Sequence, residues 1–363
     1  MRIAVCAFLA ATGLVAPALA QGERTPTFWN TVQATCDATA AKPATPLGRR
    51  IAQSAVDEFT SFGGHRIDSN GRIFRFGLTE AEHDEDDGGT GQAHLGHLGW
   101  WQVMKYWRAL FDDGPADKLE VRGYRDASTS TEDGHNAELL RTSAARLLSI
   151  AQDVRDPEER EILREAAVRA AIVDTSWSAA FISYVVRQSG TGANAFHFSN
   201  AHRTYIYDAF ATSAAEVAGK ADEHIYRACP LATRPRIGDM ICSQREPGLA
   251  EASDEAVRER VRSELDGSPE ARSIRRSHCE VVAYVDKGAR KIYTIGGNVS
   301  QAVTTRKLNL RRDGRVSAVQ KGNCDGAAHW ALPQPLAQAA GARAPAEKCS
   351  LNDKKWFVLL QLR

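Results

Sequence analysis

Three residues in the second half of the chain have the types and the order that nucleophilic hydrolysis requires. Ser178 is predicted in the first turn of a helix that starts within DTSWSAAFISYVV, His278 opens a predicted strand, and Asn298 ends the next one. A serine hydroxyl attacks a carbonyl only when a base removes its proton, and a histidine with a pKa of about 6.5 suits that role. Asn298 would hold the imidazole in the productive tautomer, and the backbone amides of the helix N-terminus would stabilise an oxyanion. The pattern predicts a Ser-His-Asn site that cleaves an amide or an ester.

Each of these residues also has a purely structural interpretation. Ser178 could satisfy a first-turn backbone donor, His278 could bond a carbonyl at a strand edge, and the glycine-rich turn could explain Asn298. Trp177 and His202 are the candidates for contact with a substrate, although a structural hydrogen bond is an equal alternative for His202.

The elements that must position these residues are helices first and strands later. Helical spacing of apolar residues predicts a helix from Leu47, one over WWQVMKYWRALF, one that carries Leu139 to Leu148, and one from Asp156 to about Ile172. Alternating patterns predict a hairpin over RIDSNGRIFRF and strands at GDMICS, HCEVVAYV, KIYTIGGN and WFVLLQL. Because no βαβ alternation occurs, we expect an α+β fold with helices packed on a small antiparallel sheet.

The first residues predict export. MRIAVCAFLAATGLVAPALA has one cation, a short apolar run and a small-residue end, so 1–20 is predicted to be a signal peptide and the protein periplasmic or secreted. Residues 21–46 are predicted to be a lead-in, and 47–363 a single domain with surface insertions at about 81–99, 112–135 and 246–276. No later stretch is apolar enough to span a membrane. The formal net charge of +1 does not favour nucleic acid as a partner.

Six of the seven cysteines lie beyond the predicted signal peptide, and an even number in an oxidising compartment favours disulfides. Cys242 ends one predicted strand and Cys279 begins another, so antiparallel pairing would bring them within disulfide reach. A second pair, Cys324 with Cys349, is predicted less directly, and buried free thiols are the alternative. Cys279 is excluded as the nucleophile because neighbouring strand residues face opposite sides: if His278 faces the helix, Cys279 faces away.

One acidic segment invites a metal interpretation. EHDEDDGGTGQAHLGHLG places Gly89 where a calcium loop that starts at Asp84 needs glycine, but Gly88 and Leu95 stand at ligand positions. A solvated acidic loop fits better, and no metal or cofactor is predicted from the sequence.

Five blocks, SWSAAFISYVVRQSG, FSNAHRTYI, GDMIC, SHCEVVAYV and IGGNVSQAVTTRKL, resemble the bacterial domain of unknown function 2272 family, from about Leu47 to Leu308. That family is similar to the CHAP and NlpC-type cysteine peptidases of cell-wall turnover, which have PWCAAF where this chain has SWSAAF. The resemblance implies a papain-like fold with Ser178 at the nucleophile position, His278 at the base position and Asn298 at the orienting position. Because a hydroxyl does not ionise as a thiol does, Ser178 would depend wholly on its base.

The resemblance leaves two functions open. The first is an exported hydrolase that cleaves an amide or ester bond, with cell-wall peptides as the substrate class that the resemblance implies. The second is a non-catalytic envelope binding module that retains the papain-like fold and binds peptidoglycan or an envelope protein. A fold shared with peptidases does not by itself decide between them.

Overall fold

The computed structural model describes residues 27–81, 98–125, 138–317, 320 and 350–363. Its α-helices are α1 (Phe28–Ala40), α2 (Pro46–Ser61), α4 (Gly99–Arg108), α5 (Ala144–Ala151), α6 (Pro157–Asp174), α7 (Ser178–Gln188), α8 (His202–Val217) and α9 (Asp254–Ser263). Its strands are β1 (His65–Ile67), β2 (Ile73–Arg75), β3 (Glu120–Arg125), β4 (Glu138–Ser143), β5 (Tyr226–Cys229), β6 (Met240–Gln244), β7 (Ser277–Asp286), β8 (Lys291–Val299), β9 (Ala302–Asn309) and β10 (Lys355–Leu362). The fold is α+β, as predicted.

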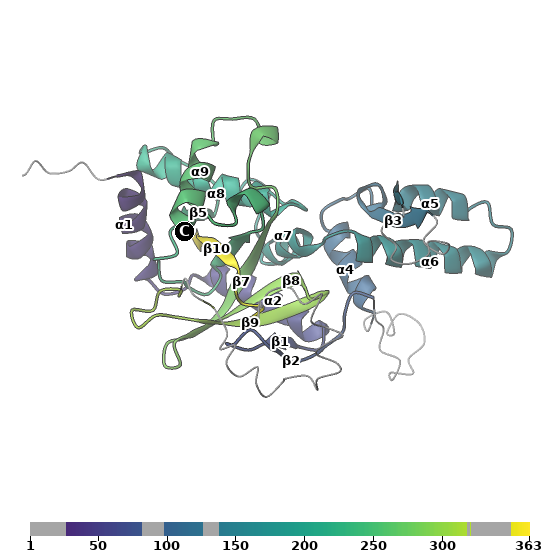
Figure 1. The fold of residues 1–363 in the computed structure, drawn as a ribbon, viewed down its shortest axis with the longest axis horizontal. Helices are drawn as coiled ribbons and strands as arrows, with labels where there is room; N and C mark the ends of the chain where they lie inside the picture. The colour runs from purple at the N-terminus through teal and green to yellow at the C-terminus, as the bar shows by residue number, and fades with distance from the viewer. Residues whose placement is uncertain (1–26, 82–97, 126–137, 318–319, 321–349) are drawn as a thin grey trace, which may run out of the picture.

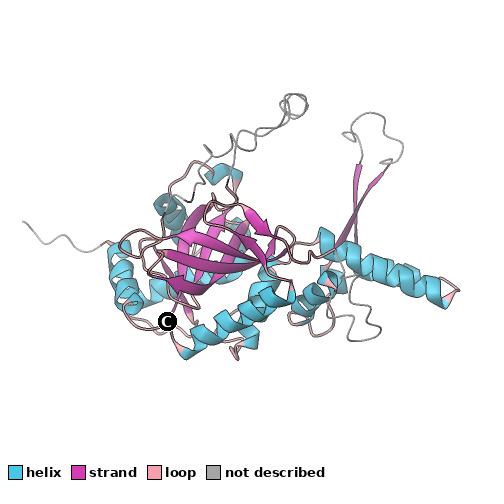
Figure 2. Ribbon diagram, turned by 90° about the horizontal axis from the view of Figure 1, so that it is seen from below, coloured by secondary structure: helices cyan, strands magenta, loops and turns pink. Residues whose placement is uncertain are grey.

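The main sheet has eight strands in the order β2-β1-β9-β8-β7-β6-β10-β5. The β1–β9 pair is parallel, and the other neighbouring pairs are antiparallel. The sheet is therefore larger than predicted, because β1, β2, β5 and β9 extend the four strands at its centre. Figure 2 shows it as one twisted sheet with helices around it.

Both faces of the sheet are buried, so the central strands alternate between two apolar clusters. Ile241, Val282 and Leu359 lie in the cluster that also contains residues of α1. Their neighbours along the same strands lie in the larger cluster, with α2, α4, α7 and α8. This alternation follows from the two-residue period of a strand and fixes which side chains of β7 and β8 face α7.

The predicted helix over Leu139 to Leu148 is wrong in its first half. Residues 138–143 form β4, which pairs antiparallel with β3, and α5 begins only at Ala144 with Ser143 as its N-cap. Figures 1 and 2 show this hairpin with α5 and α6 projecting from the body that holds the main sheet. The predicted start of α6 is confirmed, because the Asp156 side chain accepts from the amides of Glu158 and Glu159.

The predicted Cys242–Cys279 disulfide is confirmed: the two residues are register partners on β6 and β7, with their Cα atoms 4.1 Å apart. A second disulfide joins Cys36 on α1 to Cys229 on β5. The predicted Cys324–Cys349 pair and the acidic segment lie outside the described residues. Two disulfides are typical of an oxidising, extracytoplasmic environment.

In the described part of the chain, no helix combines the length and the apolar character that crossing a membrane requires.

Removing the Cys36–Cys229 bond should destabilise the protein strongly, because it joins residues 193 positions apart and so restricts a long segment of the unfolded chain. We expect the double variant C36S/C229S to lose about 3 kcal/mol of unfolding free energy, measured by urea denaturation at neutral pH. An unchanged denaturation midpoint under non-reducing conditions would contradict this expectation. Wild-type protein treated with reductant should be at least as unstable as the variant, since reduction breaks both disulfides.

Candidate functional site

The candidate site is built around the start of α7. The first hydrogen bond of this helix runs from the Phe181 amide to the Trp177 carbonyl, 3.0 Å away, and Ser178 is the first helical residue. Trp177 stands at the N-cap without a side-chain hydrogen bond to the first turn. The N-terminus of α7 therefore lacks the side-chain hydrogen-bond acceptor that a serine or aspartate cap would supply. This leaves first-turn donors and the positive end of the helix dipole beside Ser178.

The Ser178 hydroxyl lies against a histidine, and that histidine is His202, at the start of α8. Ser178 Oγ and His202 Nε2 are 2.7 Å apart, and both side chains are buried. The other ring nitrogen of His202, Nδ1, bonds the Tyr205 hydroxyl one turn later on α8. Serine, imidazole and phenol therefore form a continuous chain of hydrogen bonds.

The environment keeps the His202 imidazole neutral. Burial lowers its pKa well below 6.5, and the nearby His278 and Arg245 lower it further. A neutral ring can accept a proton at Nε2, which is the state that a general base requires. Both the position and the neutral state of His202 are therefore those that a general base for Ser178 requires.

His278 lies next to this chain of hydrogen bonds. Its ring packs edge-on against His202 with 5.2 Å between the centroids, and its Nε2 is 3.3 Å from Glu280 Oε1. No hydrogen bond joins it to Ser178 within the residues that the structure describes. Burial lowers the pKa of His278, an effect that Glu280 opposes.

Glu280 is the centre of a buried polar network. It accepts from Arg306 Nε at 2.6 Å and from Thr294 Oγ1 at 2.5 Å, and its side chain is fully buried. Although burial by itself raises its pKa, the Arg306 charge and the hydrogen bonds outweigh that effect and bring it to about 2. Glu280 is therefore ionised, and its carboxylate lies beside the His278 ring, 3.3 Å from Nε2.

Two adjacent glycines of β8, Gly296 and Gly297, show which face of the sheet lies against α7 and which lies against His278. A Cβ on Gly297 would lie 2.5 Å from Phe181 Cβ on α7, whereas one on Gly296 would lie 3.0 Å from His278 Nε2. His278 is thus on the Gly296 side, and Cys279 packs in the cluster that contains Phe181. The structure places Cys279, rather than His278, on the α7 side of β7. Cys279 carries no free thiol there, because it is bonded to Cys242.

The remaining predicted residues lie around this centre. Asn298 has a φ of 52° in the irregular end of β8 and makes no side-chain hydrogen bond to His278 or His202 among the described residues. The Trp177 indole is fully buried and donates to Glu80 at 2.6 Å, so it packs in the core at the start of α7. Burial raises the pKa of Glu80 to about 7, although the Trp177 hydrogen bond lowers it.

A family described as uncharacterized proteins conserved in bacteria, the domain of unknown function 2272 family, matches residues 96–362. The chain belongs to this family. No curated protein and no solved structure matches the chain. The matched range contains Ser178, His202 and His278, but it starts later and ends later than the resemblance in the sequence suggested.

In this member of the domain of unknown function 2272 family, sequence reasoning missed Tyr205 and Glu280 as parts of the site. Both had a signal in their spacing. Tyr205 follows His202 by three residues, which puts the two on one face of a helix, and Glu280 follows His278 by two, which puts them on one face of a strand. For His202 the sequence left two interpretations open, contact with a substrate and a structural hydrogen bond.

A cavity of about 830 Å³ is lined by Arg245 together with residues of β6, β10 and the segment around α9. The charge of Arg245 lowers the pKa of both His202 and His278. The volume of the cavity is within the range of small-ligand sites. Ser178, His202 and His278 are not among the residues that line it.

Proposed function

We propose that this protein is an exported hydrolase in which Ser178 is the nucleophile and His202 is its general base. The 2.7 Å separation of Ser178 Oγ and His202 Nε2 is the observation that carries the proposal. It is the distance at which an imidazole takes a proton from a serine during attack. The sequence pattern predicted His278 for this role, and the proposal moves it to His202.

The reaction uses the groups around Ser178 in turn. As Oγ bonds the carbonyl carbon of an amide or ester, its proton passes to His202 Nε2, while Nδ1–H donates to Tyr205. The carbonyl oxygen becomes an oxyanion beside the first-turn amides of α7. The tetrahedral intermediate collapses with loss of the amine or alcohol, which takes the proton from His202. Water then cleaves the acyl-serine by the same route and restores both groups.

His278 and Glu280 serve in this proposal as positioning residues. The His278 ring packs against His202 and lies beside the ionised Glu280, so the base has little freedom to turn away from Ser178. α7 packs on β7 and β8, the strands that carry His278 and Asn298, and this packing supports the proposal. Cell-wall peptides are the substrate class that the resemblance to wall peptidases favours.

A fluorophosphonate probe tests the nucleophile without knowledge of the substrate, because serine displaces fluoride only when its proton is removed. We expect the wild-type chain to be labelled at Ser178, as found by peptide mass spectrometry. Labelling should be lost in Ser178→Ala, which removes the buried hydrogen bond to His202 at a cost of about 1–3 kcal/mol. Ser189→Ala, at the other end of α7, is the matched control and should be labelled like the wild type.

An unlabelled wild-type chain that nevertheless co-sediments with isolated peptidoglycan would favour the other function, a binding module without chemistry. Label on a serine other than Ser178 would also exclude the proposed nucleophile.

A further inference from the structure

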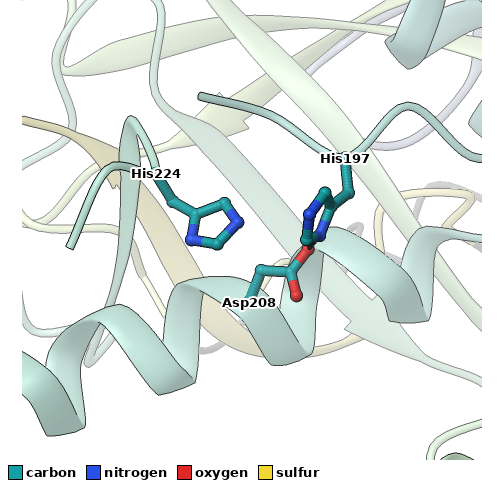
Figure 3. Close-up of side chains that lie close together, drawn as sticks. All are labelled: His197, Asp208 and His224. Carbon is teal, nitrogen blue, oxygen red and sulfur yellow. Dashed lines mark hydrogen bonds and ion pairs between the residues drawn. The ribbon is translucent and has the colours of Figure 1, made fainter. Parts of the chain in front are cut away.

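A second cluster of polar side chains lies on the surface near α8, separate from Ser178. His197 precedes α8, Asp208 lies on it, and His224 precedes β5 (Figure 3). Each residue offers one ligand atom, and these atoms lie within 4.8 Å of one another. His197 Nδ1 is 2.8 Å from Asp208 Oδ2, and the two imidazole rings are 4.8 Å apart between centroids. We propose that these three residues bind one Zn²⁺ ion.

The donor set is suited to this metal. Imidazole nitrogen and carboxylate oxygen are both zinc ligands, and three protein ligands leave the fourth tetrahedral position for water. With bonds of about 2.1 Å, the donor atoms of a zinc site lie about 3.4 Å apart, so the cluster has to close by roughly 1.5 Å at most. His197 can supply that movement, because its side chain is 54% exposed.

The orientation of His224 is a second, independent observation. Its Nδ1 is 3.0 Å from Asp222 Oδ1, while its Nε2 is buried and has no hydrogen-bond partner. Asp222 is itself fixed, because it accepts from Thr212 Oγ1 on α8 and from the His224 amide. A carboxylate on one ring nitrogen that leaves the other for a ligand is the arrangement found behind zinc-bound histidines.

The space between the side chains fits a single ion. A cavity of about 10 Å³ is lined by the three proposed ligands and by aromatic residues that include Phe196 and Tyr205. This is about the smallest cavity that holds one water molecule. Figure 3 shows a ring nitrogen of His224 directed towards His197, with Asp208 beside them. A bound ion would tie the segment before α8 and the segment before β5 to α8 itself.

Zinc binding is measured directly on the untagged full chain, first by isothermal titration with ZnCl₂ and then by thermal unfolding. We expect one ion per chain and a rise in the unfolding temperature of about 5 °C when free zinc is about 100 times the dissociation constant. Both effects should disappear in H197A/H224A and weaken in Asp208→Asn. Cobalt(II), used in place of zinc, should give the strong visible absorption of a four-coordinate site in the wild type only.

The matched control removes the histidines of the acidic segment instead. H83A/H94A/H97A lacks one histidine more than H197A/H224A, yet it should keep both the stoichiometry and the thermal shift. The proposal is overturned if the wild type binds no zinc, if H197A/H224A still binds one ion, or if the control variant loses it. Circular dichroism of each variant without metal shows whether it is folded, and labelling of Ser178 is not part of the readout, so the two proposals fail independently.

Discussion

Replacing His202 by glutamine should abolish most of the reactivity of Ser178 towards a fluorophosphonate. The variant keeps a polar side chain of similar size but no group that can take a proton from Oγ. General-base catalysis contributes about 10²- to 10⁴-fold, so we expect the second-order labelling rate to fall at least about 100-fold. His278→Gln should cost less than about tenfold, since its ring supports His202 without bonding Ser178. Far-UV circular dichroism checks that both variants are folded.

The opposite ranking would decide for the arrangement that the sequence pattern predicted. If His278→Gln abolishes labelling while His202→Gln leaves it intact, His278 is the base, and the contact seen here between Ser178 and His202 is structural.

The pH dependence of the same reaction is a second readout for the base. The working form of His202 is neutral, and burial lowers the pKa of its imidazolium well below 6.5. The labelling rate should therefore stay constant as pH falls through 6.5 and decrease only at lower pH. A decrease centred near pH 6.5 would mean that the base is a solvent-exposed histidine.

Removing the charge of Glu280 should have the largest effect on stability among the changes considered. Glu280→Gln leaves the Arg306 guanidinium buried without its counter-ion, and breaking a buried pair in this way costs about 3–5 kcal/mol. Urea denaturation at pH 7 measures the loss. Glu138→Gln is the matched control, because Glu138 pairs with Arg125 at the surface, where such contacts contribute less than about 1 kcal/mol.

The effect of Glu280 should depend on pH with a known sign. The pKa of the Glu280 carboxyl is about 2 in the folded chain, whereas an ordinary glutamate has a pKa of 4.5. The ionised form therefore stabilises the folded state. That contribution is complete above pH 4.5 and is lost as pH falls towards 2; the pKa difference corresponds to about 3 kcal/mol. The wild type should therefore lose its advantage over Glu280→Gln in this range. An advantage that is unchanged between pH 5 and pH 3 would contradict the network.

A compensating variant keeps this prediction testable if Glu280→Gln does not fold. Replacing both partners by apolar residues, as in E280L/R306M, removes the buried charges together and should recover most of the lost stability. If the double variant is as unstable as either single variant, the damage comes from packing and not from an unpaired charge.

Local patterns in the sequence determined several of the elements around the site. The Asp-Pro start of α6, the apolar spacing of α2 and α4, and the alternation in β6, β7, β8 and β10 each depend on neighbours within one turn or one strand. The Cys242–Cys279 pair was also accessible, since antiparallel neighbours put it in register. These features follow from local geometry, so one sequence is enough to find them.

Contacts between distant segments required the tertiary structure. Residues 138–143 were predicted to be helical from the spacing of Leu139 and Leu140 relative to Leu147 and Leu148, but pairing with β3 makes them a strand. The histidine next to Ser178 is decided in the same way. The sequence offered two histidines as partners for Ser178. The tertiary structure brings His202, at the start of α8, to the hydroxyl at the start of α7. The alternation of β7 puts His278 on the same face as Glu280. The sequence therefore named Ser178, His202 and His278, and the tertiary structure decided which of them meet.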